Sequence, residues 1–142
     1  MVNASLTETR KFFRNFLASS LVNIGNASNR LWKMTDAIDI RHLEQYVFGD
    51  RSLLDEILTI YIDQATMLLE RLDAASDDQS WHSTAHTLKG ASRGVGAWAV
   101  GDLAEAAEKL TGPARLAERV DMIERLRSTG QVAIEFARAY RG

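Results

Sequence analysis

Apolar side chains recur every three or four residues along most of this chain, which is the spacing of amphipathic helices. The strongest stripe runs for about five turns between residues 53 and 72. Its members are Leu53, Leu54, Ile57, Leu58, Tyr61, Ile62, Ala65, Leu68, Leu69 and Leu72. No stretch shows the alternation of a half-buried strand. The pattern therefore predicts an all-α protein.

Shorter stripes predict further helices on both sides of this one. One short helix is expected over 40–47 and ends near Gly49 and Asp50. A second is expected from about Trp81 to Val95, after a loop at 76–80 whose last residues are good N-caps. A third spans 100–110 and is closed by a glycine and a proline at 112–113.

The last helix is expected to begin near Ala114. Its stripe consists of Leu116, Val120, Ile123 and Leu126, and it extends to Ala133 and Ala137 if the chain stays helical through Gly130. Four long helices joined by short loops pack most simply as an antiparallel four-helix bundle.

The N-terminal segment differs from the rest in charge. Residues 1–33 hold five basic side chains and one acidic one, whereas the whole chain has a net charge of −2. This shift places a boundary near Met34, with an N-terminal extension at 1–33 and the bundle at 34–142. Apolar residues at 5–24 predict an additional helix in the extension. It could pack on the bundle, form a dimer contact, lie on a membrane surface, or be a translated extension ahead of a start at Met34.

The composition of the chain excludes several classes of function. The near-neutral charge argues against nucleic acid as a partner, because phosphate backbones require clustered cations. The chain has no cysteine, which excludes disulfides and thiolate chemistry and fits a reducing cytoplasm. We find no run long enough for a membrane span and no secretory signal pattern. We also find no phosphate-binding glycine loop or nucleotide motif, so ATP-dependent self-phosphorylation is not expected.

His86 is the most informative single residue. Each helical residue advances by about 100°, which places the apolar positions of 81–95 opposite His86. Those positions are Trp81, Ala85, Leu88, Ser92 and Val95. The positions near His86 are His82, Lys89, Gly90 and Arg93. Since the apolar stripe faces the core, His86 is predicted to face outward.

An outward imidazole beside a lysine and a glycine suits phosphoryl chemistry. A neutral imidazole is a good nucleophile near pH 7. Lys89 lies one turn on and can neutralise phosphoryl oxygens, while Gly90 leaves room for an incoming partner. A mid-helix glycine costs stability, so its presence asks for a local reason.

Other interpretations stay open at this point. His86 could be an ordinary solvated histidine, or His82 and His86 could form a metal pair on one helix face, although no further ligand is marked by spacing. Glu105 and Glu108 lie on the following helix. Either could accept a hydrogen bond from one ring nitrogen and fix the tautomer, or both could be solvated acids.

The run Ala85-His86-Thr87-Leu88-Lys89-Gly90-Ala91, with Gly96, Ala97, Leu103 and Glu108 after it, resembles the histidine-containing phosphotransfer (HPt) domains of bacterial phosphorelays. The resemblance covers 39–110 by motif and extends to about residue 139 by helix pattern. It implies a four-helix bundle in which His86 is phosphorylated on Nε2. Lys89 would assist the phosphoryl group, Gly90 would provide clearance, and Glu108 would bond the other ring nitrogen.

The resemblance also implies partners. The phosphoryl group would pass between receiver-domain aspartates, one in a hybrid histidine kinase and one in a response regulator. Magnesium would belong to those receivers, and this chain would have no cofactor of its own. It would act as a monomeric, stoichiometric carrier rather than an enzyme. The alternative is an HPt-like module that docks on receivers or kinases without being phosphorylated. The extension at 1–33 is not part of the usual family pattern.

Overall fold

The computed structural model describes residues 37–75 and 77–141. The helix expected at 5–24 and the boundary expected near Met34 lie outside these residues. The described residues are almost entirely helical, without a strand among them, so the all-α prediction is confirmed. The elements are α3 (Ile40–Val47), α4 (Arg51–Ala74), α5 (Asp78–Val95), α6 (Trp98–Glu108), the short 3₁₀ helix η2 (Pro113–Arg115) and α7 (Leu116–Arg141).

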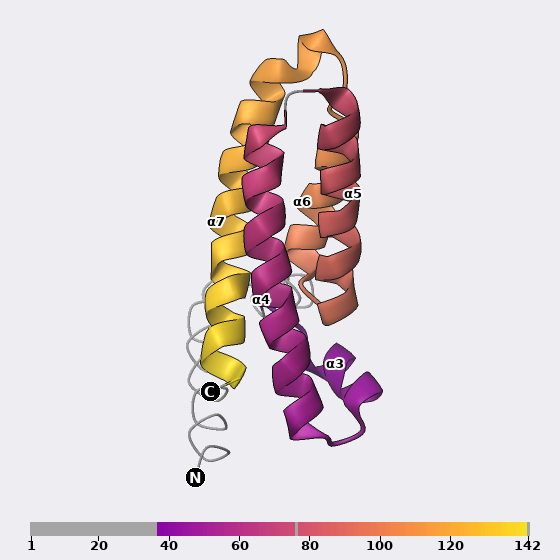
Figure 1. Ribbon diagram of the computed structural model, residues 1–142, viewed down its shortest axis with the longest axis vertical. Coiled ribbons are helices and arrows are strands. Elements are labelled where there is room, and N and C mark those ends of the chain that lie inside the picture. The colour runs from indigo at the N-terminus through magenta and orange to yellow at the C-terminus, as the bar shows by residue number, and fades with distance from the viewer. Residues whose placement is uncertain (1–36, 76, 142) are drawn as a thin grey trace, which may run out of the picture.

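Four of these helices form an antiparallel bundle, as predicted. In Figure 1, α4 rises from the end where α3 lies, α5 descends beside it, α6 rises again, and α7 returns to the starting end. Each helix packs against the next one along the chain, and α4 also packs against α7, which closes the ring. None of the helices at 37–75 and 77–141 combines the length and apolar character needed to cross a membrane.

Helix α5 carries the sequence-predicted site, and its inward face is the one that the pattern predicted. The buried residues on α5 are Trp81, Ala85, Leu88, Ser92 and Val95. The helix begins at Asp78, three residues before the predicted start, because the Asp77 side chain accepts a 2.6 Å hydrogen bond from the backbone N–H of Ser80. The cap lies at the beginning of the predicted loop rather than at its end.

One polar pair lies in the core between α4 and α5. The Tyr61 hydroxyl and Ser92 Oγ are 3.0 Å apart, and both side chains are buried. Burial raises the pKa of Tyr61 to about 12 against the opposing effect of its hydrogen bond with Ser92. The phenol therefore stays protonated at neutral pH, and each hydroxyl has a partner.

The turn between α5 and α6 determines which residues of the two helices face each other. Gly96 ends α5 with a φ of 83°, a left-handed conformation that favours glycine. A Cβ there would stand 2.8 Å from the backbone oxygen of Asp39, at the start of α3. Helix α6 follows at once and ends at Glu108, two residues earlier than predicted. The turn thereby places α6 antiparallel beside α5, with Glu108 opposite His86.

Helix α7 is continuous through Gly130, as the sequence allowed. The prediction that its whole apolar stripe faces the core is wrong at two positions. Leu116 and Val120 are 59% and 70% exposed, whereas Arg119 is buried. The Arg119 guanidinium stacks over the Trp81 ring, donates a 2.6 Å hydrogen bond to the backbone oxygen of Leu110 and pairs with Asp78. These polar partners from α5 and the end of α6 stabilise a buried cation at this end of the bundle.

Candidate functional site

His86 lies near the middle of α5 on its exposed face. Its side chain is 64% exposed, and the five buried residues of α5 lie on the opposite side of the helix. The outward orientation predicted from periodicity is therefore the observed one. An imidazole in this position is open to a second protein.

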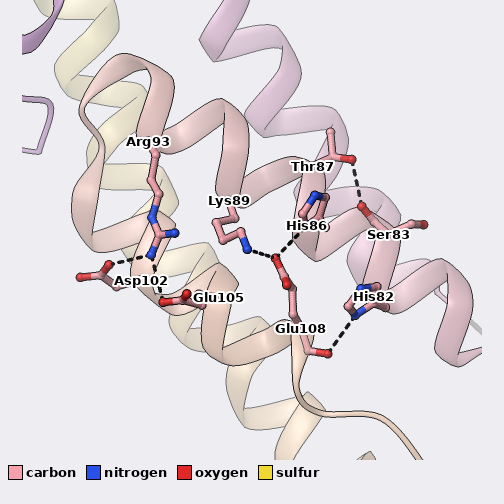
Figure 2. Close-up of polar contacts among 9 residues, drawn as sticks. All are labelled: His82, Ser83, His86, Thr87, Lys89, Arg93, Asp102, Glu105 and Glu108. Carbon is pink, nitrogen blue, oxygen red and sulfur yellow. Dashed lines mark hydrogen bonds and ion pairs between the residues drawn. The ribbon is translucent and has the colours of Figure 1, made fainter.

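Helix α6 supplies the main partner of the His86 ring. Oε1 of Glu108 lies 3.1 Å from Nδ1 of His86. Figure 2 shows the Glu108 side chain reaching from α6 to this ring. An ionised carboxylate can only accept a hydrogen bond, so Nδ1 carries the ring proton when the imidazole is neutral. The lone pair then resides on Nε2, which is the nitrogen that can act as a nucleophile.

Glu108 is held in its ionised form. Its side chain is only 13% exposed, and this burial alone would raise the pKa of its carboxyl group. The hydrogen bond and positive charge of Lys89, followed by the contact with His86, outweigh the burial and lower the pKa of Glu108 below its ordinary value. The acceptor that fixes the His86 tautomer is thus a charged one.

Lys89 binds the same carboxylate oxygen. Its Nζ lies 2.8 Å from Oε1 of Glu108. Helical spacing places Lys89 near His86 on the outward face of α5, but its side chain is only 20% exposed. The salt bridge draws the lysine into the seam between α5 and α6. This arrangement anchors the ammonium group beside the imidazole instead of leaving it mobile in water.

Gly90 leaves an open surface next to His86. It is exposed, and among residues 37–75 and 77–141 an added Cβ would meet no atom within 4 Å beyond its own stretch of helix. The fold therefore does not require a glycine at this position, although glycine costs helix stability.

The two glutamates that the sequence weighed equally have different partners. Glu105 accepts a 3.0 Å hydrogen bond from Arg93, which also contacts Asp102 at 3.4 Å. Glu108, one turn further along α6, is the residue that contacts His86. Counting residues from the α5–α6 turn does not predict this choice, because His86 lies ten residues before Gly96, whereas Glu105 and Glu108 lie nine and twelve residues after it.

Sequence reasoning missed the role of His82 in this seam, because it considered that residue only as a metal ligand. Nδ1 of His82 lies 3.2 Å from the backbone oxygen of Glu108. The His82 and His86 rings are nearly parallel, with an interplanar angle of 14° and centroids 6.3 Å apart. Helical spacing alone indicated that the two rings are neighbours, but it could not reveal a backbone partner on α6.

The metal interpretation gains no further ligand from the structure. Over residues 37–75 and 77–141, no group of three or more His, Cys, Asp or Glu side chains is placed to hold a metal ion. Both histidines use Nδ1 for a contact with Glu108.

Comparison with known proteins identifies one family. A family model described as Hpt domain matches residues 56–135, which is more than half of the chain. The match covers most of α4, all of α5 and α6, and most of α7. No curated protein and no solved structure gives a match.

Proposed function

The chain belongs to the Hpt-domain family, and from that premise we propose that it carries a phosphoryl group on Nε2 of His86 between the aspartates of two receiver domains. Hpt domains act in histidine phosphotransfer within phosphorelays and are phosphocarriers rather than kinases. One receiver would belong to a hybrid histidine kinase and the other to a response regulator. We place this exchange in the cytoplasm and expect the carrier to be a monomer.

The observation that carries the proposal is the pairing of an exposed His86 ring with a largely covered carboxylate at Nδ1. In the transfer step, the Nε2 lone pair attacks the phosphorus of a receiver aspartyl phosphate. The bond between phosphorus and the acyl oxygen breaks, and the aspartate leaves as a carboxylate. The ring becomes positively charged as the N–P bond forms, and the negative charge of Glu108 at Nδ1–H offsets this charge. The reverse reaction loads the second receiver.

Lys89 and Gly90 have supporting roles in this scheme. The Lys89 ammonium group is held beside His86 through Glu108, where it can neutralise the oxygens of the phosphoryl group. Gly90 removes the side chain that would obstruct the approach of the receiver. Magnesium would be supplied by the receiver's own acidic pocket, and we assign no cofactor to this chain.

The test is label transfer from a receiver. Candidate receiver domains are first phosphorylated with ³²P-labelled acetyl phosphate and magnesium, and each is then mixed with the carrier. We expect the wild-type chain to take up acid-labile, alkali-stable phosphate, and the His86→Gln variant to take up none. A His82→Asn variant, whose side-chain amide keeps an N–H donor at position 82, should still be labelled. Labelling of His86→Gln on another residue would refute the assignment.

The docking alternative makes a different prediction in the same experiment. A module that only docks would bind a receiver without acquiring acid-labile phosphate. The intact set of His86, Lys89, Gly90 and Glu108 favours transfer, since docking alone does not require a free Nε2 beside a held ammonium group.

A further inference from the structure

We propose that His82 is a positioning residue for the phosphoacceptor: it holds the end of α6 through the backbone of Glu108 and thereby keeps the His86 imidazole in the tautomer with a free Nε2. The kinetic consequence of this proposal rests on the proposed function. The effect on the tautomer does not, because it concerns the unphosphorylated protein.

Glu108 is the last residue of α6, where helical carbonyl groups lack partners within the helix. Two consecutive residues of α5 supply partners to two consecutive carbonyls. Trp81 Nε1 donates a 2.7 Å hydrogen bond to the oxygen of Ala107, and His82 Nδ1 lies 3.2 Å from the oxygen of Glu108. Trp81 is buried and contributes to the core, whereas His82 is exposed. The contact of His82 can therefore be removed without opening the core.

This contact determines that Nδ1 of His82 carries a proton. A backbone carbonyl can only accept, so Nδ1 of His82 must donate. The His82 ring is then oriented parallel to His86, and both rings direct Nδ1 to the same residue (Figure 2). His82 holds the backbone of Glu108, and the carboxylate of Glu108 holds His86.

Loss of the backbone contact would act on His86 through Glu108. The distance between Glu108 Oε1 and His86 Nδ1 is already 3.1 Å, and hydrogen bonds weaken steeply when they lengthen or bend. Fraying of the last turn of α6 would loosen this bond, while Lys89 could still retain the carboxylate at 2.8 Å. The His86 ring would then sample its other tautomer, in which Nε2 carries the proton and cannot attack phosphorus.

The first experiment reads the tautomer of His86 directly in the unphosphorylated full-length chain. Ring ¹⁵N shifts and long-range ¹H–¹⁵N correlations are recorded at about pH 8, above the ordinary histidine pKa. The variants are His82→Ala and His82→Asn, whose amide N–H can replace Nδ1–H. The control is Ser83→Ala, since Ser83 is exposed and its hydroxyl donates a hydrogen bond to the backbone oxygen of Ser80 within α5.

We expect Nδ1 of His86 to be protonated and Nε2 bare in the wild type, Ser83→Ala and His82→Asn. In His82→Ala the signals should shift toward a mixture of both tautomers, without a matching fall in the thermal unfolding midpoint relative to His82→Asn. An unchanged His86 spectrum in His82→Ala would overturn the proposal. Failure of His82→Asn to restore the wild-type spectrum would also overturn it.

Transfer from a phosphorylated receiver provides the second measurement. The loss of one hydrogen bond between neutral groups predicts a transfer rate about three- to tenfold lower in His82→Ala, with recovery in His82→Asn. If the wild type accepts no label, the proposed function fails while the tautomer result still decides the role of His82. If the wild type accepts label and His82→Ala matches it in rate and spectrum, only the positioning role fails.

Discussion

Oε1 of Glu108 on α6 lies 3.1 Å from Nδ1 of His86 on α5. This contact joins the two helices at the exposed ring and leaves Nε2 as the nitrogen with a lone pair. The same oxygen binds Lys89, so one carboxylate positions both the nucleophile and the cation beside it. The reactivity that we propose for His86 therefore depends on a residue of the neighbouring helix.

Replacement of Glu108 by glutamine tests this dependence. The Glu108→Gln side chain has the same size but lacks the charge that offsets the positive ring. A charge-assisted hydrogen bond is worth about 1–2 kcal/mol more than a neutral one, so we expect phosphotransfer to slow about tenfold. Single-turnover label transfer measures the rate. The matched control is Glu105→Gln, because Glu105 pairs with Arg93 on the same seam. Equal rates in the two variants would contradict the role of Glu108.

The lowered pKa of Glu108 makes a prediction about stability and pH. A carboxyl group whose pKa is lower in the folded than in the unfolded chain stabilises the fold above its unfolded-state pKa. This contribution is lost as the pH falls from the ordinary value of 4.5 through the lower folded value. The difference in free energy of unfolding between wild type and Glu108→Gln should therefore be largest at neutral pH and shrink in acid. Urea titrations at neutral and acidic pH measure it, and a difference that grows in acid would contradict the assignment.

The helical periodicity of the sequence was sufficient to predict the buried face of α5, because five apolar or small positions opposite His86 leave no other inward face. Periodicity could not reveal that Arg119 takes the inward place of Leu116 and Val120, because its partners Asp78 and Leu110 come from other elements.

At the candidate site, too, the sequence pattern predicted which side chains of α5 face outward, but not their contacts with α6. The pattern around His86 indicated an exposed imidazole with a lysine nearby. It did not indicate that Lys89 is drawn into a salt bridge, since that depends on a carboxylate from α6. The contact of His82 with a backbone carbonyl leaves no mark in the sequence, because every residue has a carbonyl group and only the fold determines which one lies nearby.

Removal of the Lys89 ammonium group should separate transfer from folding. Lys89→Met keeps the apolar stem but cannot neutralise phosphoryl oxygens, and we expect transfer to slow at least about tenfold, the value of a charged hydrogen bond. Because the two side chains are only 20% and 13% exposed, loss of this ion pair should cost about 1–3 kcal/mol, which is more than an exposed pair contributes but leaves the bundle folded. Lys109→Met is the control, since Lys109 is exposed at the end of α6. A Lys89→Met chain that transfers at the wild-type rate would exclude the assistance that we propose.

The buried pair of Tyr61 and Ser92 predicts a strongly non-additive mutant cycle. Each single variant, Tyr61→Phe or Ser92→Ala, leaves a buried hydroxyl without its partner and should cost about 1–3 kcal/mol. The double variant removes both hydroxyls and should be less destabilised than the sum of the single variants. Urea unfolding of the four proteins measures the coupling. Additive losses would show that the 3.0 Å contact contributes nothing to stability.

Replacement of Gly90 and of Gly94 by alanine tests whether the absence of a side chain at Gly90 serves the approach of a receiver. Both lie in α5, and in the described part of the chain an added Cβ at either position meets no atom within 4 Å beyond its own stretch of helix. Replacement by alanine should therefore stabilise the bundle by about 0.5–1 kcal/mol in both variants, since alanine has the higher helix propensity.

The two variants should differ in transfer. Gly90 lies one turn after His86, so Gly90→Ala places a methyl group where a receiver must approach the ring, whereas Gly94→Ala places it a further turn away. We expect phosphotransfer to slow in Gly90→Ala and to stay at the wild-type rate in Gly94→Ala, with both proteins more stable than the parent. Label transfer measures the phosphotransfer rate, and urea unfolding of the same preparations measures the stability. A Gly90→Ala chain that is stabilised and transfers normally would mean that the glycine serves no docking role.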